Sequence, residues 1–84
     1  MKIIWSPLAV QRMTEIADYS SRENPTTAVN WAKAVFEKIE NIVEFHYMGR
    51  VVPEADRNEI RELIFKNYRI IYRVEIDHIS ILTI

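Results

Sequence analysis

Residues 61–74 read Arg-Glu-Leu-Ile-Phe-Lys-Asn-Tyr-Arg-Ile-Ile-Tyr-Arg-Val and contain two apolar runs on either side of Lys66-Asn67. The runs are rich in β-branched and aromatic side chains, which pack well on a pleated sheet and favour strands. A two-residue turn at 66–67 would join the runs as an antiparallel hairpin and set their register. The pairs predicted to lie opposite each other are Phe65 and Tyr68, Leu63 and Ile70, and Arg61 and Tyr72.

This predicted hairpin has two different faces, because side chains alternate along a strand. One face is apolar and should be core: Leu63, Phe65, Tyr68, Ile70, Tyr72 and Val74, with Arg61 at its edge. The other face mixes charges with aliphatic residues: Glu62, Ile64, Arg69, Ile71, Arg73 and Glu75. On that face Glu62 is diagonal to Arg69 and Arg73, within reach of long side chains, so cross-strand ion pairs are expected.

Length and composition indicate one small globular domain spanning residues 1–84. The chain is 49% hydrophobic and 27% charged, which is typical of a folded rather than a disordered protein. It has no cysteine, so it has no disulfide framework and no thiolate metal site. No apolar run approaches the ~20 residues of a membrane-spanning helix, and we therefore expect a cytoplasmic protein without a membrane partner.

Charge does not favour a general nucleic-acid binder. The chain carries 11 basic and 12 acidic residues, a net charge of −1, whereas nucleic-acid binders usually have a clear basic excess. Residues 50–73 hold six basic and four acidic side chains. This local excess is small and is typical of a solvated surface.

Two cap-and-proline signals indicate two helices. A short apolar strand, Lys2 to Trp5, is followed by Ser6-Pro7, which suits the start of a helix that should run to about Ser21. Asn24-Pro25 repeats the signal before a second helix, Thr26 to about Phe45. Its apolar seam has the 4, 3, 4, 3 spacing of helices that pack together: Ala28, Ala32, Val35, Ile39 and Ile42. With so short a connection, the helices should form an antiparallel hairpin.

The rest of the chain is extended. Gly49, the only glycine, suits a turn with positive φ. Residues 51–54 should be extended, because Pro53 disfavours the helical conformation of the residue before it. Residues 79–84 form a last strand, so the order is β-α-α-β-β-β. The predicted class is α+β, with an N-terminal strand and a helical hairpin packed on one face of a twisted antiparallel sheet. Because the chain stops on apolar strand residues, we expect either that the native gene continues past Ile84 or that a partner covers this edge.

Few residues suggest catalysis. His46 and His78 are isolated and lack metal-ligand spacing, and there is no phosphate loop or nucleophile motif. One plausible set combines a carboxylate with cations, which can cleave RNA without metal by taking the 2′-hydroxyl proton and stabilising the phosphorane. That set is Glu54, Arg61, Lys66, Arg69 and Arg73. Spacing alone favours the simpler interpretation, in which these charges are ion pairs on a solvated face.

A protein interface is the stronger signal. Helices on one face of the sheet would leave aliphatic residues uncovered on the other, rimmed by charge, and such patches mark interfaces. The predicted partner-binding residues are Ile64, Arg69, Ile71, Arg73, Leu82 and Ile84.

The order and spacing of several short motifs resemble the RelE/ParE superfamily of small bacterial toxins, from Ile3 to Ile84. The motifs are Trp5-Ser6-Pro7-x-Ala9, Asn24-Pro25 before Ala28, Gly49-Arg50 with Pro53-Glu54, Arg61-Glu62-Leu63, and Tyr68-Arg69-Ile70-Ile71-Tyr72-Arg73. The resemblance implies the fold predicted above. It also implies the toxin of a type II toxin–antitoxin pair, held in a hetero-oligomer by a cognate antitoxin, with no cofactor or metal.

The superfamily has two branches with different targets. ParE-like members inhibit DNA gyrase without a nuclease site. The sequences of residues 61–63 and 68–72 and the near-neutral charge of the chain resemble this branch more closely. We therefore expect a gyrase inhibitor of the plasmid-stabilisation type. One alternative is a RelE-like mRNA endonuclease acting on the ribosome, with Arg61 and Glu54 as catalytic candidates. The other is a degenerate toxin that only binds its antitoxin. Family members usually continue past the last strand, where nuclease members place catalytic residues, so the chain as it stands should lack a complete nuclease site.

Overall fold

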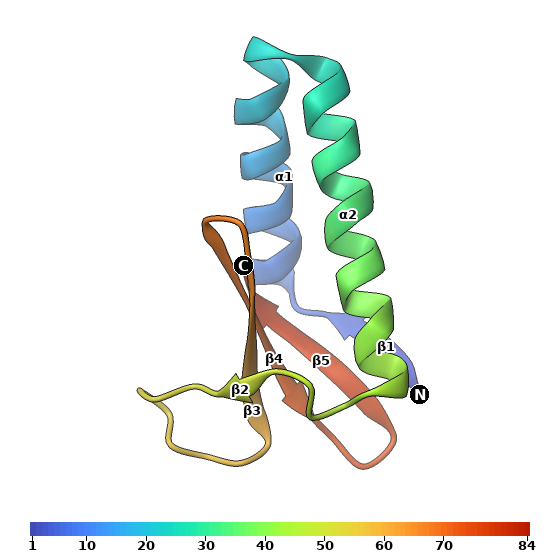
Figure 1. Ribbon diagram of the computed structural model, residues 1–84, viewed down its shortest axis with the longest axis vertical. Helices are drawn as coiled ribbons and strands as arrows, with labels where there is room; N and C mark the ends of the chain where they lie inside the picture. The colour runs from blue at the N-terminus through green and yellow to red at the C-terminus, as the bar shows by residue number, and fades with distance from the viewer.

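A computed structural model describes all residues, 1–84, and shows a helical hairpin beside a five-stranded sheet (Figure 1). The elements in chain order are β1 (Lys2–Trp5), α1 (Pro7–Glu23), α2 (Pro25–Glu44), β2 (Arg50–Val51), β3 (Ile60–Phe65), β4 (Tyr68–Val74) and β5 (His78–Thr83). The predicted α+β class and element order are confirmed. The structure adds β2, a two-residue strand at the sheet edge.

Both helices begin as their caps predict. The Ser6 side chain accepts a hydrogen bond from the Ala9 amide, and the Asn24 side chain accepts from the amides of Thr26 and Thr27. α1 runs two residues further than expected, α2 begins and ends one residue earlier than expected, and only Asn24 separates them. Its extended conformation (φ −154°, ψ 104°) suits the residue before a proline, so one residue both ends α1 and caps α2.

The sheet has the strand order β1-β5-β4-β3-β2. The β3–β4 pair has the predicted register, with Phe65 opposite Tyr68 and Arg61 opposite Tyr72. The other neighbours are also antiparallel except β1 and β5, which run parallel, so the sheet is mixed rather than wholly antiparallel.

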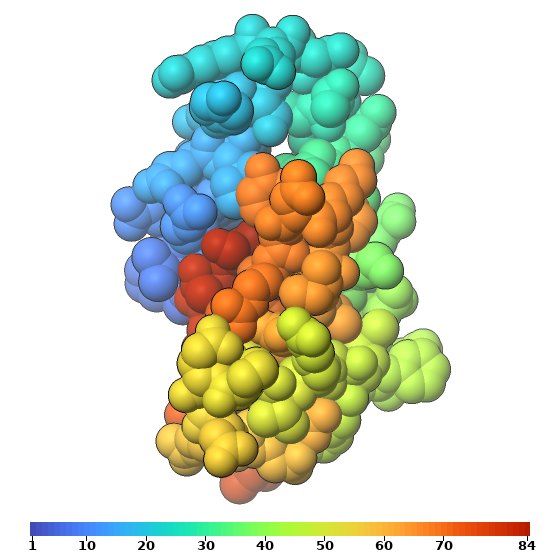
Figure 2. All heavy atoms as spheres, turned by 60° about the vertical axis from the view of Figure 1, so that its left-hand side comes forward, coloured from blue at the N-terminus to red at the C-terminus, as the bar shows by residue number.

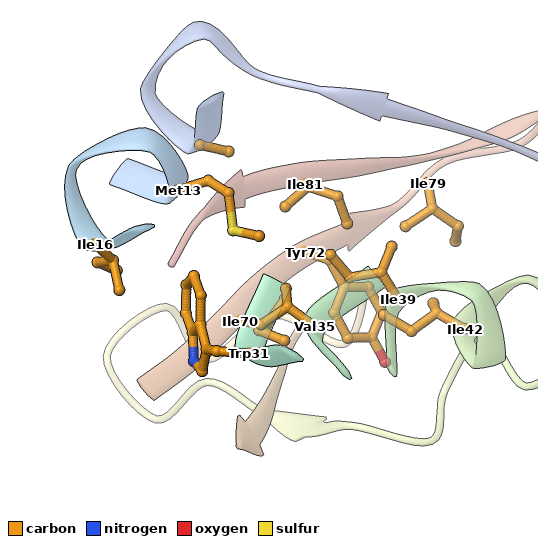
Figure 3. Close-up of a cluster of buried hydrophobic side chains, with 11 residues drawn as sticks. Met13, Ile16, Trp31, Val35, Ile39, Ile42, Ile70, Tyr72, Ile79 and Ile81 are labelled. Carbon is orange, nitrogen blue, oxygen red and sulfur yellow. The ribbon is translucent and has the colours of Figure 1, made fainter. Parts of the chain in front are cut away.

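One compact apolar cluster joins the helices to one face of the sheet (Figure 3). Its buried members are Ala9, Met13, Ile16, Trp31, Val35, Ile39, Ile42, Ile70, Tyr72, Ile79 and Ile81. Burying an aliphatic side chain of this size contributes ~1.5–3 kcal/mol, so these contacts dominate the stability of the domain. The core face of the hairpin and the seam of the second helix are thus confirmed, with Phe36 left half-exposed against the edge of Trp5.

Gly49 differs from its prediction. No glycine in the structure has positive φ, but a Cβ at Gly49 would lie 2.6 Å from the Glu62 carbonyl oxygen and 2.8 Å from the Tyr72 hydroxyl. The position therefore requires glycine for close packing rather than for its backbone angles. Positive φ occurs instead at Asp56 and at Lys66, in the hairpin turn. No helix is both long and apolar enough to cross a membrane.

Candidate protein-binding site

The sheet face turned away from the helices, which we call the open face, is organised around Glu62. This carboxylate is the only buried charged side chain, at 1% exposure. Its Oε1 accepts from Arg50 Nε and its Oε2 from Arg69 Nε, each at 2.6 Å. Arg69 Nη1 also donates to Glu54 Oε2 at 3.0 Å. Glu62 therefore ties the edge segment that follows α2 to the centre of the sheet.

Electrostatics keep Glu62 ionised despite its burial. Burial raises the pKa of this carboxyl, but hydrogen bonds from Arg69 and Arg50 lower it more, and its pKa lies below the ordinary value. The bond from Arg69 likewise lowers the pKa of Glu54. The same pairs raise the pKa of Arg69. The network is thus fully charged at neutral pH and its charges cancel.

The predicted ion pair between Glu62 and Arg73 does not form. Arg73 lies opposite Ile60 and pairs with Glu75, with 3.2 Å between Arg73 Nε and Glu75 Oε1. Arg50 takes the place expected for Arg73, because β2 puts Arg50 directly opposite Glu62. The hairpin pattern missed Arg50, which lies outside the hairpin and reaches Glu62 only through tertiary pairing.

A depression of about 390 Å³ opens where α1, the end of β5 and the start of β4 meet. Its lining residues are Arg12, Asn67, Tyr68, Arg69, Ile71, Thr83 and Ile84. Figure 2 shows this region, with the dark-red end of β5 at the surface between blue α1 and the orange β3–β4 hairpin. Three predicted partner-binding residues, Arg69, Ile71 and Ile84, thus come together here. Arg12 was not predicted, since nothing in the helical pattern of α1 placed it beside β4.

The other predicted partner-binding residues are dispersed. Ile64 is 54% exposed on the hairpin, away from the lining of the depression. Leu82 is half-buried beside an irregular step in the β4–β5 pairing, and its carbonyl accepts from the Ser6 hydroxyl at 2.8 Å. Ile84 was expected on the open face or its edge, but it also packs against the core cluster because the irregular step turns the end of β5.

Arg61 and Glu54, the two catalytic candidates, are not brought together. Arg61 and Glu62 are neighbours on β3, so their side chains point to opposite faces. Glu54 reaches the open face through Arg69, which also holds Glu62. Arg61 points to the other side of the strand.

On that other face, Arg61 binds main-chain groups on both sides of β2. Its Nε donates to the Asn58 carbonyl at 2.8 Å, its Nη1 to the Gly49 carbonyl at 3.1 Å and its Nη2 to Asn58 Oδ1. Its guanidinium also lies 4.9 Å from the centre of the Tyr47 ring. These contacts join the two ends of the segment that carries β2.

Tyr72 supports the same segment from inside the core. Its hydroxyl donates to the His46 carbonyl at 2.8 Å and accepts from the Gly49 amide at 3.0 Å. Burial raises the pKa of Tyr72, which keeps the hydroxyl protonated and able to donate. The position of the chain between α2 and β2 is therefore set by buried hydrogen bonds.

Two further features lie elsewhere on the surface. An apolar groove of about 350 Å³ lies on the helix side, lined by Trp5, Val10, Met13, Thr14 and Phe36. Asp77, His78 and Ser80 form a local hydrogen-bonded chain at the β4–β5 turn, with Asp77 Oδ1 2.7 Å from His78 Nδ1 and His78 Nε2 3.1 Å from Ser80 Oγ. None of these three side chains lines a depression on the molecule. No cluster of His, Asp and Glu has an arrangement that could hold a metal ion.

These features define a small α+β domain: a helical hairpin on a mixed sheet whose open face carries a buried ion-paired glutamate. The family of the ParE toxin of the type II toxin–antitoxin system, parDE, matches residues 3–84, and the chain belongs to this family. The predicted toxin superfamily and its ParE-like branch are thereby confirmed.

A solved structure supports the fold. The chromosomal ParDE toxin–antitoxin system from P. aeruginosa contains a chain with a TM-score of 0.79 to this structure. The two chains are 20% identical, and the match covers 99% of this chain and 91% of the other. A search of curated proteins finds no match. At this identity the structural likeness establishes the fold and no more.

Proposed function

We propose that this chain is a toxin that inhibits DNA gyrase by binding it, in the cytoplasm and without catalysis of its own. We further propose that a cognate antitoxin neutralises it by covering the open face. Membership of the ParE family supports a toxin. The separation of Arg61 from Glu54 supports action by binding, because a nuclease needs its base and its cations around one phosphate.

The single observation on which this proposal depends is that the Arg61 guanidinium already binds groups of the protein itself. All three of its guanidinium nitrogens donate to the main chain or side chain of Gly49 and Asn58. A cation used in this way positions a loop. It is not free to stabilise a phosphorane on the opposite face.

The discriminating experiment is a DNA supercoiling assay with purified gyrase, run beside an mRNA cleavage assay on programmed ribosomes. We expect the chain to inhibit supercoiling and to leave ribosome-bound mRNA intact. Absence of inhibition together with codon-linked mRNA cleavage would establish the nuclease alternative. Loss of both activities with retained antitoxin binding would identify a degenerate toxin.

Variants of Arg61 refine this test. Arg61→Lys keeps the positive charge but cannot reproduce the forked contacts to Gly49 and Asn58. We expect Arg61→Lys and Arg61→Ala to weaken gyrase inhibition together and to lower the melting temperature, since both release the segment carrying β2. Arg22→Ala, on the exposed end of α1, is the matched control. mRNA cleavage that is lost in Arg61→Ala with an unchanged melting temperature would contradict the positioning role.

The proposed antitoxin partner is tested by co-expression of this chain with a candidate antitoxin. We expect a stable complex and slower hydrogen exchange of the backbone amides of β3 and β4 around Ile64 and Ile71. Protection confined to the helix-side groove at Trp5 and Phe36 would move the proposed interface to the other face of the molecule.

A further inference from the structure

The depression between α1, β4 and β5 has an unusual charge for this chain. Its seven lining residues include two arginines, Arg12 and Arg69, and no acidic residue, whereas the chain as a whole is acidic by one charge. The lining also includes the aliphatic side chains of Ile71 and Ile84 and the polar residues Asn67, Tyr68 and Thr83. The surface thus pairs cations with an apolar floor.

The two arginines differ in how free they are. Arg69 is held by Glu62 and Glu54 and its charge is already balanced. Arg12 pairs only with Glu15, at 2.8 Å between Nη1 and Oε2, and the two side chains are 42% and 49% exposed. An ion pair so open to water contributes little and exchanges easily. Arg12 can therefore donate hydrogen bonds to a ligand, whereas Arg69 is held in place by its two carboxylates and lines the depression.

We propose that this depression binds an extended protein segment that carries a carboxylate next to an aliphatic side chain. The carboxylate accepts from Arg12, and the aliphatic side chain covers Ile71 and Ile84. This inference rests on the proposed function, because the segment is assigned to the antitoxin. At about 390 Å³ the depression is near the lower end of the ~300–1,000 Å³ typical of ligand pockets, which suits one or two side chains.

The surroundings favour an acidic peptide over a nucleic acid. Nucleic-acid affinity comes from several phosphate contacts at once, and two arginines, one of them neutralised, cannot supply them. A single carboxylate with an apolar neighbour matches the charge and the apolar floor together.

The test is an NMR titration of the isotope-labelled full chain with two blocked tetrapeptides. The acidic probe is acetyl-Leu-Glu-Leu-Asp-amide, and its neutral match is acetyl-Leu-Gln-Leu-Asn-amide. We expect saturable shifts in the amides of residues 67–71 and 83–84 with the acidic probe. The neutral probe should bind about two- to fivefold more weakly, as expected for the loss of one solvated charge pair.

Arg12→Gln is the decisive variant, because Arg12 has no buried partner and the change should leave the fold intact. It should weaken binding of the acidic probe about two- to fivefold and remove the preference over the neutral probe. Arg22→Gln makes the same charge change on the same helix, outside the depression, and should bind like the unchanged chain. Ile71→Ala should weaken both probes equally.

Three outcomes would overturn the inference: equal binding of both probes, equal effects of Arg12→Gln and Arg22→Gln, or displacement of the peptide by a tighter-binding single-stranded oligonucleotide. Failure of the proposed function looks different. If no antitoxin co-purifies or gyrase is not inhibited, Arg12-dependent peptide binding still stands. If the antitoxin binds without Arg12, the inference falls and the antitoxin remains.

Discussion

Glu62 shows how one residue can be buried and charged at once. Its side chain has an arginine on each carboxylate oxygen, and both arginines keep part of their surface in water, at 68% exposure for Arg50 and 40% for Arg69. The arginines thus stay partly hydrated while the carboxylate is fully enclosed. This reduces the desolvation cost that makes many buried ion pairs unfavourable.

Replacing this carboxylate should cost stability. We expect Glu62→Gln to lower the free energy of unfolding by about 1–3 kcal/mol, because a neutral amide cannot accept two charge-assisted hydrogen bonds and leaves buried groups unpaired. Urea denaturation followed by circular dichroism measures the change. Glu75→Gln removes a carboxylate whose side chain is 32% exposed and paired with Arg73, and it should cost much less. Equal effects of the two variants would contradict the special role of Glu62.

The same residue predicts an acid-sensitive fold. The pKa of Glu62 is lower in the folded state than its ordinary value of 4.5, so the folded state binds protons less readily than the unfolded state. The stabilisation is therefore complete above about pH 4.5 and is lost as pH falls through the lower, folded pKa. Urea midpoints measured from about pH 7 to about pH 3 should fall only at the acid end. In Glu62→Gln the fall of the urea midpoint at acid pH should be smaller. If the variant and the unchanged chain show the same fall, other carboxylates cause it.

Among the elements, the helical hairpin depends on a single connecting residue. Asn24 ends α1, since its amide donates to the Ser20 carbonyl, and it caps α2 through Thr26 and Thr27. The turn joining the helices lies at the end far from the sheet, where no strand can support it (Figure 1). Local chemistry must therefore hold this turn.

Removal of this cap should be measurable. We expect Asn24→Ala to lower the free energy of unfolding by about 0.5–2 kcal/mol, because two amides at the start of α2 lose their acceptor. Asn24→Asp should restore most of it. Asn30→Ala, at an exposed position inside α2, is the matched control and should be neutral or slightly stabilising. Thermal melts that place Asn24→Ala level with the control would show that tertiary packing alone holds the hairpin.

The edge segment shows what strand pairing adds to such local signals. β2 has only two residues, yet contacts on both faces of the sheet hold it in place. Arg50 binds Glu62 of β3 on one face, and Arg61 of β3 and Tyr72 of β4 bind Gly49, next to β2, on the other. Its sequence was expected to be extended, but its place beside β3 depends on contacts with residues 10 and 12 positions away. The ion pair that organises the open face follows from that pairing.

On the scale of the whole molecule, apolar surface is left uncovered on two sides. Ile64 on the hairpin is 54% exposed, and Val10 and Phe36 beside the helix-side groove are 50% and 48% exposed. Patches of this kind on a small monomer mark interfaces. They agree with a protein that works in complexes.

We therefore expect the isolated chain to self-associate at high concentration. Light scattering after size exclusion should show a mass that rises with concentration, and Ile64→Lys should reduce this rise by placing a charge on the open face. Co-expressed antitoxin should abolish it. A monodisperse monomer at every concentration would indicate that neither surface needs a partner.

Much of the fold could be predicted because its signals are local. The register of the β3–β4 hairpin follows from a two-residue turn and the period of two along a strand, and both helix starts follow from a polar cap before a proline. The candidate site was predicted only in part. Arg69 and Ile71 were placed by strand alternation, but the irregular step in β5 moved Ile84 against the core. Arg12 joins the depression from α1, and Arg50 reaches Glu62 from the sheet edge.

The sequence by itself determined the helical hairpin, the β3–β4 register and the apolar face of that hairpin, because each depends on residues a few positions apart. Only the tertiary structure decided that Arg61 clamps main chain on one face while Glu54 joins Arg69 on the other. It also decided that β1 runs parallel to β5, that Gly49 is needed for space, and that Arg12 meets Arg69. The physical reason is the same in each case. These contacts join distant parts of the chain, and their geometry is set by how the core packs.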